Sequence, residues 1–545
     1  MSELQRQLQL AKHYRKLKFL VVDDFENFRH SIRQMIRTFG VEGIEIAGNG
    51  EDAVERCERE NFDIILCDYN LGSGKNGQQV LEELRFNRVL KHTSIFVLIT
   101  AETSKDMVMG ALEYLPDGYI TKPMTKAVLQ KRLDNMIEQR EAMRPINEAI
   151  DNEAYDVAID LLNKEISGES KYITWCLRTL ANLYYREGEY LRARHIYENV
   201  LSRRDIGWAR LGIGRVKVAL GEYDEAVEDL SALIDQNGNL IEAYDVLADA
   251  YLKKGSGKLA QRTLQKAVDI SPHAIIRQKK LASVCSNNKD YDGAASAFRK
   301  TMKLGFNSVH ESADNYLNLG RSLSDLAEGD KTELGKKRAK EAVHTMERVG
   351  KKFKDDKNVR MSAALIESRV HKGQGDDAKS KAALLKAEKV MSVEDADAYT
   401  ILDFAKTLYA TGQGDKAEVL LSELAEKNAD NSDIIAKIEE LLDEPVSLQE
   451  KSKARQLNKQ GIGAFEKGDL DEAVKVFEEA LLVTPKHPSL NLNMIQVMLK
   501  QISQQNGNPE LKRKCMNCLD NVKHIPAQHR QYKRFAHLQK KVGAL

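Results

Sequence analysis

The chain has 545 residues, enough for several domains, and its formal net charge of +1 argues against a nucleic-acid binder or a disordered acidic chain. Six cysteines in a chain of this length do not resemble a disulfide framework. No stretch approaches the roughly 18 apolar residues of a membrane helix, and the first residues lack the apolar centre of a signal peptide. We therefore expect a cytoplasmic protein without membrane insertion.

The first 140 or so residues alternate between short apolar runs and helical patterns, after an expected N-terminal helical extension at residues 1–16. The apolar runs cover residues 19–24, 44–48, 63–68, 94–100 and 118–123. Near-continuous apolar character is typical of strands that are buried on both faces of a parallel sheet. This part of the chain is therefore expected to form a doubly wound α/β domain with a five-stranded parallel sheet.

Polar side chains stand where these runs end. Asp23 and Asp24 close the first run, and Asp68 closes the third. Thr100 closes the fourth run, and Lys122 stands near the end of the fifth. Ligands of such folds collect at the carboxyl ends of the strands, so we expect these five groups to converge. Three carboxylates in one small site repel each other unless a cation lies among them, and hard oxygen ligands suit Mg²⁺.

In this order and at these strand ends, the five residues resemble the receiver domain of two-component response regulators, over residues 17–137. The resemblance implies a flavodoxin-like fold. It also implies that Asp68 is the nucleophile that takes a phosphoryl group from a phosphohistidine on a sensor histidine kinase. Asp23, Asp24 and Asp68, with the backbone carbonyl of Asn70, are then expected to hold Mg²⁺, which neutralises charge on the transferring group.

The same resemblance gives roles to further positions. Lys122 is expected to pair with a phosphoryl oxygen and Thr100 to hydrogen-bond another, while Tyr119 follows the threonine inward. Ala101 leaves space for the phosphoryl group, and the bond before Pro123 is a candidate cis peptide. Two positions are expected to tune self-dephosphorylation, namely Asn70 and Glu102.

The loop after the phosphoacceptor departs from the family pattern. The glycine that closes this loop usually stands eight residues after the acceptor, whereas Asp68 and Gly77 are nine apart. Gly72 and Gly74 can absorb the extra residue, because glycine adopts positive φ at little cost. We expect an altered loop with intact chemistry.

After an expected linker helix at residues 138–150, the chain reads as helical and repetitive. A small residue near twelve positions before each repeated alanine and a bulky residue four after it recur in most copies. The alanines are Ala193, Ala226, Ala260, Ala294, Ala417 and Ala473, and the first three steps are 33, 34 and 34 residues. The small residues are Ala181, Gly214, Ala248, Ala282, Ala405 and Gly461, and the bulky ones are Tyr197, Leu230, Leu264, Phe298, Leu421 and Phe477.

This pattern is similar to the tetratricopeptide repeat, a helix–turn–helix of 34 residues. The resemblance implies an all-α superhelix over residues 151–445, best matched at 170–305, and one more unit at 446–486. Such repeats stack on their neighbours and usually hold a partner protein in a concave groove. Between the best copies the match is looser, with about ten extra residues around 320–345.

The last segment, residues 487–545, is expected to form basic capping helices. From Lys486 onward, eleven lysines and arginines stand against only two acidic residues. A solvated face is the preferred interpretation, and nucleic-acid binding is the less favoured one, since no recognition motif supports it. Cys515 and Cys518, with His524 and His529 nearby, are of zinc-ligand type, but a single CxxC pair favours two cysteines on an amphipathic helix.

Taken together, the chain is expected to be a bacterial response regulator with a tetratricopeptide output that binds a partner protein according to the phosphorylation state of Asp68. Phosphorylation is expected to reshape the face formed by the helix after Thr100, the strand at 118–123 and the helix that follows. The main alternative is a modulator of a shared sensor kinase, as a phosphate drain or a blocker of phosphotransfer. No enzyme signature appears beyond self-phosphorylation and self-dephosphorylation, and a homodimer stays open.

Overall fold

The computed structural model describes residues 3–101, 114–168, 170–442, 448–504, 509–523, 525 and 531–543. The chain divides into two compact units, residues 1–322 and 323–545, and the boundary falls within helix α17 (Ala313–Ala327). Among the described residues, no helix is both long and apolar enough to cross a membrane.

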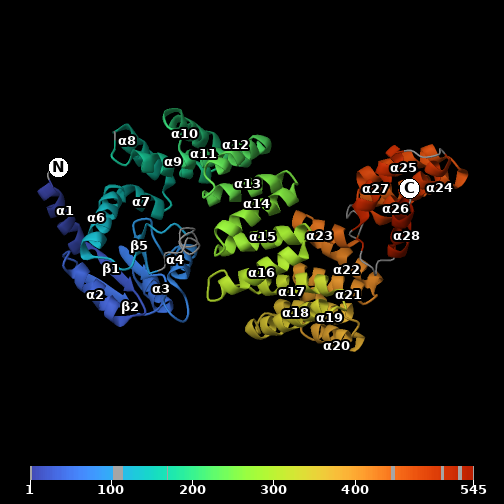
Figure 1. Cartoon of the computed structure of the whole chain (residues 1–545), viewed down its shortest axis with the longest axis horizontal. Helices are drawn as coiled ribbons and strands as arrows, with labels where there is room; N and C mark the ends of the chain where they lie inside the picture. The colour runs from blue at the N-terminus through green and yellow to red at the C-terminus, as the bar shows by residue number, and fades with distance from the viewer. Residues whose placement is uncertain are drawn as a thin grey trace. The chain divides into compact units, whose positions relative to one another are not determined.

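The first unit begins with a five-stranded, all-parallel sheet, coloured blue in Figure 1. Its strand order is β2-β1-β3-β4-β5, and neighbouring strands pair in register, for example Phe19 with Ile64. The predicted doubly wound fold is thus confirmed. The strands are β1 (Lys18–Val22), β2 (Gly43–Ala47), β3 (Ile64–Asp68), β4 (Ile95–Thr100) and β5 (Gly118–Thr121).

Helices cover both faces of this sheet. On one face, α1 (Glu3–Lys16), α2 (Glu26–Arg37) and α6 (Lys126–Ala142) bury leucine, isoleucine and aromatic side chains against the strands. On the other face lie α3 (Gly50–Arg59) and α4 (Gly77–Phe86). Because both faces are covered, β3 and β4 are buried along their whole length, which explains their continuous apolar sequence.

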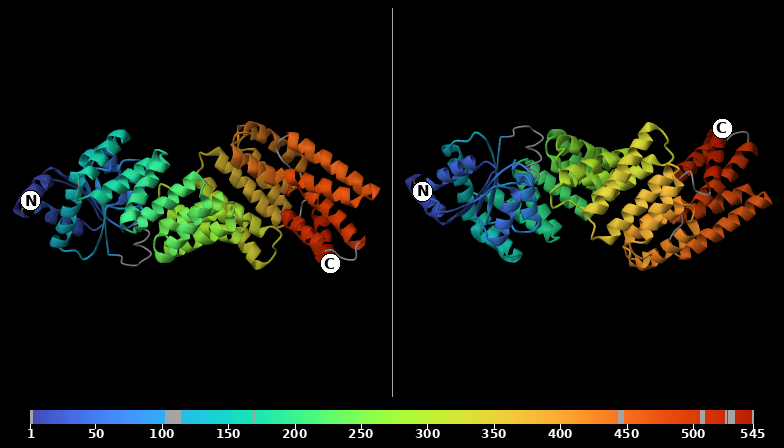
Figure 2. Two further views of the ribbon diagram at one scale, coloured as in Figure 1. Left: turned by 90° about the horizontal axis from the view of Figure 1, so that it is seen from above. Right: turned by 90° about the horizontal axis from the view of Figure 1, so that it is seen from below.

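The segment expected as one linker helix is divided at Met143 between the end of α6 and a separate helix, α7 (Arg144–Asp151). Pro145 lies in the first turn of α7, where a missing backbone N–H costs nothing. Antiparallel helix pairs follow, as the green ribbons of Figures 1 and 2 show. These helices are α8 (Tyr155–Ser167), α9 (Ile173–Arg186), α10 (Tyr190–Arg203), α11 (Gly207–Leu220), α12 (Tyr223–Gln236), α13 (Ile241–Lys253), α14 (Gly257–Ile270), α15 (Ile275–Asn287) and α16 (Tyr291–Gly305).

The repeated small and bulky residues pack between these helices. All six repeated alanines are fully buried at 0% exposure, and every bulky partner is 3% exposed or less. A Cβ atom on Gly214 would lie 2.6 Å from Leu230 of the same repeat, whereas one on Gly212 would meet the ring of Tyr197 from the preceding repeat. The small residues therefore admit bulky side chains both within a repeat and between repeats.

The second unit continues the helical pattern with longer helices. Helix α18 (Glu333–Lys352) has 20 residues and α19 (Lys357–Gly373) has 17, which accommodates the extra residues noted in the sequence. The remaining helices are α20 (Asp377–Glu388), the short η1 (Val393–Asp395), α21 (Ala398–Ala410), α22 (Gly414–Lys427), α23 (Ser432–Leu442), α24 (Leu448–Lys467), α25 (Leu470–Val483), α26 (Pro488–Gln504), α27 (Pro509–Val522) and α28 (Tyr532–Gly543).

The two cysteines of the CxxC pair are part of the C-terminal core. Cys515 is 0% exposed and Cys518 is 7% exposed, and both pack among apolar residues that include Leu519 and Val522. Burial raises the pKa of Cys515 to about 11 and that of Cys518 to about 12, so both thiols stay protonated. The two nearby histidines, His524 and His529, lie outside the described residues.

Candidate functional site

The polar residues at the strand ends meet at one edge of the sheet. Asp23 and Asp24 follow β1 directly, Asp68 ends β3, and Thr100 ends β4. Lys122 follows β5. The parallel arrangement brings these positions together because every strand ends on the same side. Asp23 is only 1% exposed and Asp68 only 6%, which is unusual for carboxylates and calls for a compensating charge.

The three carboxylates form a candidate cation site. One oxygen from each of Asp23, Asp24 and Asp68 lies within 4.8 Å of the others. Asp24 Oδ1 is buried without a hydrogen-bond partner, so an acceptor is available for a ligand. A compact set of hard, anionic oxygens with a free acceptor fits Mg²⁺. The receiver fold and this cluster together support a magnesium pocket.

Lys122 supplies positive charge to this cluster. Its Nζ lies 2.8 Å from Asp23 Oδ2 and 3.1 Å from Asp68 Oδ2. The same ammonium lies 3.9 Å from the centre of the Phe28 ring on α2, a cation–π contact. The Lys122-Pro123 peptide bond is cis. Asp23, Asp68 and the Phe28 ring together hold the Lys122 ammonium at the acid cluster.

Burial dominates the electrostatics of Asp68. It raises the pKa of this carboxyl from 3.8 to about 6, although the neighbouring Lys122 acts in the opposite direction. Near pH 7 the carboxylate form still prevails, which a nucleophile or metal ligand requires. Below about pH 6, proton uptake competes with both roles.

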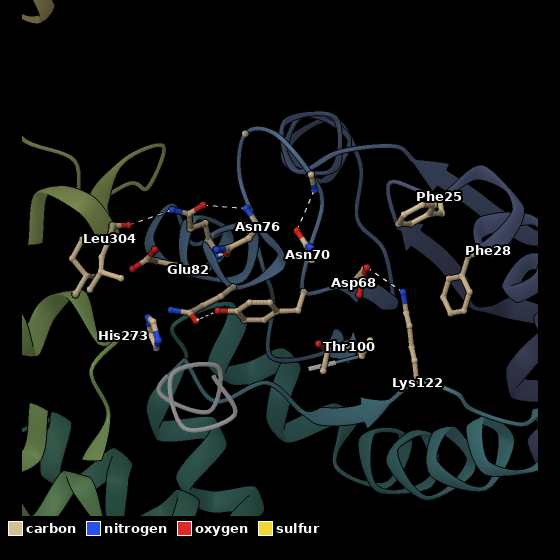
Figure 3. A pocket seen from close by; sticks show the side chains of 17 residues that line it. Phe25, Phe28, Asp68, Asn70, Asn76, Glu82, Thr100, Lys122, His273 and Leu304 are labelled. Carbon is tan, nitrogen blue, oxygen red and sulfur yellow. Dashed lines mark hydrogen bonds and ion pairs between the residues drawn. The ribbon is translucent and has the colours of Figure 1, made fainter. Parts of the chain in front are cut away.

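A cavity of about 820 Å³ opens beside Asp68 (Figure 3). Asn70, Thr100, Ala101 and Lys122 line it together with Asp68. Tyr119 is not among its lining residues, because its partly buried ring packs against the core between the sheet and helices α3 and α4. Glu102, the second residue expected to tune dephosphorylation, lies outside the described residues.

The loop between Asp68 and α4 has the conformation that its glycines permit. Gly72 has φ +75° and Gly74 has φ +101°, both in the left-handed region. A Cβ on Gly77 would clash with the backbone carbonyl oxygen of Asp68, so the loop closes tightly on the acceptor. Asn76 then caps α4 in a capping box, in which Asn76 and Gln79 each bond the other's backbone N–H.

Some residues of the site gave no signal in the sequence. Phe28 lies on the apolar face of α2, and nothing in the sequence indicates that its ring contacts the Lys122 ammonium. His273 and Leu304, from the helical repeats, line the same cavity, on the side opposite Phe28 and Lys122 in Figure 3. Phe28 and Lys122 are 94 positions apart, and His273 and Leu304 lie more than 150 positions from the receiver residues of the cavity, so no local pattern reports these contacts.

Comparisons with known proteins agree with this geometry. Residues 19–134 match the family model of the response regulator receiver domain. Tetratricopeptide repeat models match residues 178–241 and 211–275, and a further one matches 464–487.

The N-terminal domain is also similar to single-domain proteins. Chemotaxis protein CheY-3 of Vibrio cholerae is 31% identical over 125 residues, which are 23% of this chain and 95% of that protein. Chemotaxis protein CheY of Pseudomonas aeruginosa is 31% identical over 123 residues, 23% of this chain and 98% of that protein. Among solved structures, a CheY-like receiver domain protein from Methanospirillum hungatei is 25% identical, covering 23% of this chain and 98% of that one, with a TM-score of 0.22. Through this domain the chain belongs to the response regulator receiver family, and tetratricopeptide repeats follow the receiver in the same chain.

Proposed function

We propose that this response regulator is a cytoplasmic protein that a sensor histidine kinase phosphorylates on Asp68, and that its repeat array binds a partner protein according to that phosphorylation. The observation that carries the proposal is the convergence of three carboxylates, Lys122 and Thr100 beside one cavity. The array supplies the binding function, since stacked repeats of this type present an extended surface to other proteins.

In the proposed transfer, a carboxylate oxygen of Asp68 attacks the phosphorus of a phosphohistidine. A P–O bond forms as the P–N bond breaks, and the electron pair of that bond stays on the departing imidazole nitrogen. Asp23, Asp24, Asp68 and the backbone carbonyl of Asn70 would hold Mg²⁺, which, when bound, neutralises charge on the transferring group.

The protein's own groups would then stabilise the acyl phosphate. Lys122 is already 3.1 Å from Asp68 and would pair with a phosphoryl oxygen. The hydroxyl of Thr100 would donate to a second oxygen, and Tyr119 would follow it inward. The side chain of Ala101 is a single methyl group, which would leave space in the cavity for the phosphoryl group. Asn70 and Glu102 would set how fast water hydrolyses the acyl phosphate, so the only chemistry is gain and loss of the phosphoryl group.

The test uses the full chain with acetyl phosphate and Mg²⁺, followed by intact-mass measurement. We expect the mass of one phosphoryl group to appear in the wild type and in Asp156→Asn, a matched control at an exposed position. Asp68→Asn is expected to gain nothing. Absence of phosphoryl uptake by the wild type, or uptake by Asp68→Asn, would contradict the proposal.

The output half is tested by pull-down from a lysate of the source cells with the unmodified and the phosphorylated chain. We expect at least one protein to change its retention by tenfold or so, which corresponds to about 1.4 kcal/mol of coupling. Capture of a sensor kinase alone, with no other protein responding, would favour a role in modulating that kinase.

A further inference from the structure

Among the described residues of the first unit, the receiver contacts the helical repeats both at their start and at a point much farther along the chain. The first joint lies at the start of the repeats, where the carboxylate of Asp151 on α7 accepts backbone N–H bonds from His92 at 2.6 Å and Thr93 at 3.1 Å. Burial opposes ionisation of Asp151, but the bonds from His92 and Thr93 outweigh it and lower its pKa. This charge-assisted joint is a firm attachment.

The second contact involves chain positions more than 200 residues apart. Gln79, Glu82 and Phe86 lie three and four residues apart on α4, and so share one face of that helix. Residues 304–310, from the end of α16 into the loop after it, meet this face. We call this contact the α4 dock.

Each residue of the α4 face has a polar or aromatic partner in the dock. Gln79 Nε2 donates to the carbonyl oxygens of Leu304 at 3.4 Å and Phe306 at 3.0 Å. Both carbonyls belong to the C-terminal end of α16, where the helix itself offers no donor. The amide of Gln79 therefore serves as a cap for a helix of the repeats.

Glu82 forms the centre of the dock. Its side chain is only 3% exposed, although it stands on an outer helix of the receiver. Oε2 accepts from the Ser308 hydroxyl at 2.8 Å, and Oε1 lies 3.0 Å from His310 Nε2. The His310 ring also meets the Phe86 ring edge-on, with ring centres 5.7 Å apart. A carboxylate buried to this degree needs such partners.

The dock is connected to the phosphorylation loop through Gln79. While its Nε2 bonds the repeats, its Oε1 accepts the N–H of Asn76 at 3.0 Å in the loop that follows Asp68. Gly77 in turn donates to the carbonyl of Tyr69, next to the acceptor, at 2.8 Å. The side chain of Gln79 thus hydrogen-bonds the acceptor loop with its oxygen and the repeats with its nitrogen. If the loop moves relative to the repeats, Gln79 cannot keep both sets of hydrogen bonds.

Electrostatic repulsion would also weaken the dock when Asp68 carries a phosphoryl group. A phosphoryl group on Asp68 brings about −1.5 to −2 of charge into the cavity. The dock faces this cavity with the carbonyl end of α16, which carries partial negative charge, and with the Glu82 carboxylate. His310 is paired with Glu82 and does not line the cavity, so His273 is the one side chain of basic type that the described repeat residues contribute to its lining.

We propose that the α4 dock is the contact through which the receiver controls its repeats: it is closed while Asp68 is unmodified and loosens when Asp68 carries a phosphoryl group. This inference rests on the proposed phosphorylation of Asp68. The sequence predicts that the receiver acts on its repeats through the face that begins with the helix after Thr100, and that helix lies outside the described residues. The present inference places the contact on α4 instead.

The experiment follows amide hydrogen exchange in the full chain, with and without beryllium fluoride and Mg²⁺ as a stable phosphoryl analogue. In the dock, Ser308 N–H bonds the Gly305 carbonyl at 2.9 Å, and Glu311 N–H bonds the Ser308 carbonyl at 3.0 Å. We expect peptides over residues 304–311 to exchange at least about fivefold faster with the analogue. Peptides over the Asp151 joint are expected to keep their rates.

Two variants weaken the dock directly, without any phosphoryl analogue. His310→Ala and Glu82→Gln are expected to speed exchange over 304–311 without the analogue, while the matched exposed controls His195→Ala and Glu198→Gln change nothing. Unchanged emission from Trp175 and Trp208, the two tryptophans of the chain, checks that the repeats stay folded.

Uptake of a phosphoryl group from acetyl phosphate is measured on the same samples. Uptake with unchanged or slower exchange over 304–311 would overturn this inference and leave the proposed function standing. Dock variants that exchange like their controls would overturn it as well. No uptake at Asp68 in the wild type would overturn both.

Discussion

The carboxyl edge of the receiver sheet and the close helix contacts of the repeats in the first unit bury different kinds of side chain. At the carboxyl edge of its sheet the receiver buries Asp23, Asp68 and, on α4, Glu82, each 6% exposed or less. The repeats bury alanines at 0% exposure and one bulky side chain opposite each of them. Buried carboxylates cost stability unless they are paired, whereas buried alanines and aromatic rings contribute to it.

This difference shows where function lies in each region. In the receiver, the residues that lower stability are those that would perform the chemistry, so chemistry and stability oppose each other at one site. In the repeats, the recurring residues are buried between helices, so a partner protein would have to contact other residues. Removing the charge of a buried carboxylate and enlarging a buried alanine should therefore change stability with opposite signs, and only substitutions at the acid cluster should respond to Mg²⁺.

The largest effect is expected for Gly77→Ala in the receiver. The added Cβ meets the backbone carbonyl of Asp68, which no side-chain rotation relieves. We expect a loss of about 3 kcal/mol in the unfolding free energy of the receiver. The measurement is the urea dependence of protease cleavage within residues 17–137, with the emission of Trp175 and Trp208 as a readout of the repeats. If the receiver of Gly77→Ala unfolds at the same urea concentration as the wild type, residue 77 does not lie as close to the Asp68 carbonyl oxygen as described.

Lys122→Met should come next, and its effect should depend on metal. Without Lys122, the carboxylates of Asp23 and Asp68 lose the ammonium at 2.8 and 3.1 Å. We expect a loss of about 2 kcal/mol in EDTA, because removing one partner leaves buried charge unpaired. Added Mg²⁺ should restore much of it. Equal losses with and without Mg²⁺ would mean that the ion does not occupy this cluster.

Ala193→Leu tests the opposite region. Ala193 is fully buried between the helices of its repeat, so a larger side chain forces them apart. A loss of about 1.5 kcal/mol is expected from such overpacking, and Mg²⁺ should not change it. Trp208 reports directly, since its ring lies 6.0 Å from that of Tyr197, one turn after Ala193. The control is Leu191→Ala, at an exposed position of the same helix, which should shift the urea midpoint little.

Asp68→Asn should have the smallest effect and the opposite sign. The pKa of Asp68 is raised from 3.8 to about 6, so ionisation of this group destabilises the folded state. The penalty appears as pH rises from about 4 to about 6 and is complete above that. At pH 8 in EDTA we expect the variant to be more stable by about 1 kcal/mol, after allowance for solvent at the cavity mouth. The difference should vanish near pH 4; a difference that persists there would assign the effect to another cause.

Much of this arrangement was predictable from the sequence, for physical reasons. Strand ends in a parallel sheet share one edge, so Asp23, Asp68 and Lys122 could be placed together from their positions alone. Burial on both faces makes β3 and β4 continuously apolar, and helix pairs need an alanine such as Ala226 at each close approach. These rules are local or periodic, and a sequence displays them directly.

The α4 dock and the cation–π contact follow no such rule. Glu82 reads as an ordinary exposed helix residue, and only the fold brings Ser308 and His310 to it. Phe28 likewise has the sequence pattern of a core residue, and only the fold brings Lys122 to its ring. The residues with which the repeats would contact a partner also follow no pattern in a single sequence, because their identity depends on that partner. What the sequence leaves undetermined is thus contact between distant segments.

The position of Lys122 has a consequence for the protein at rest. Because an ammonium lies between Asp23 and Asp68, the acidic pocket carries its own counter-ion and does not depend on bound metal to keep the sheet edge intact. We therefore expect the chain to fold without added metal. Asp23 and Asp68 would also be the residues that hold a divalent cation, so in the proposed mechanism Lys122 would give up part of its pairing with them and pair with a phosphoryl oxygen instead.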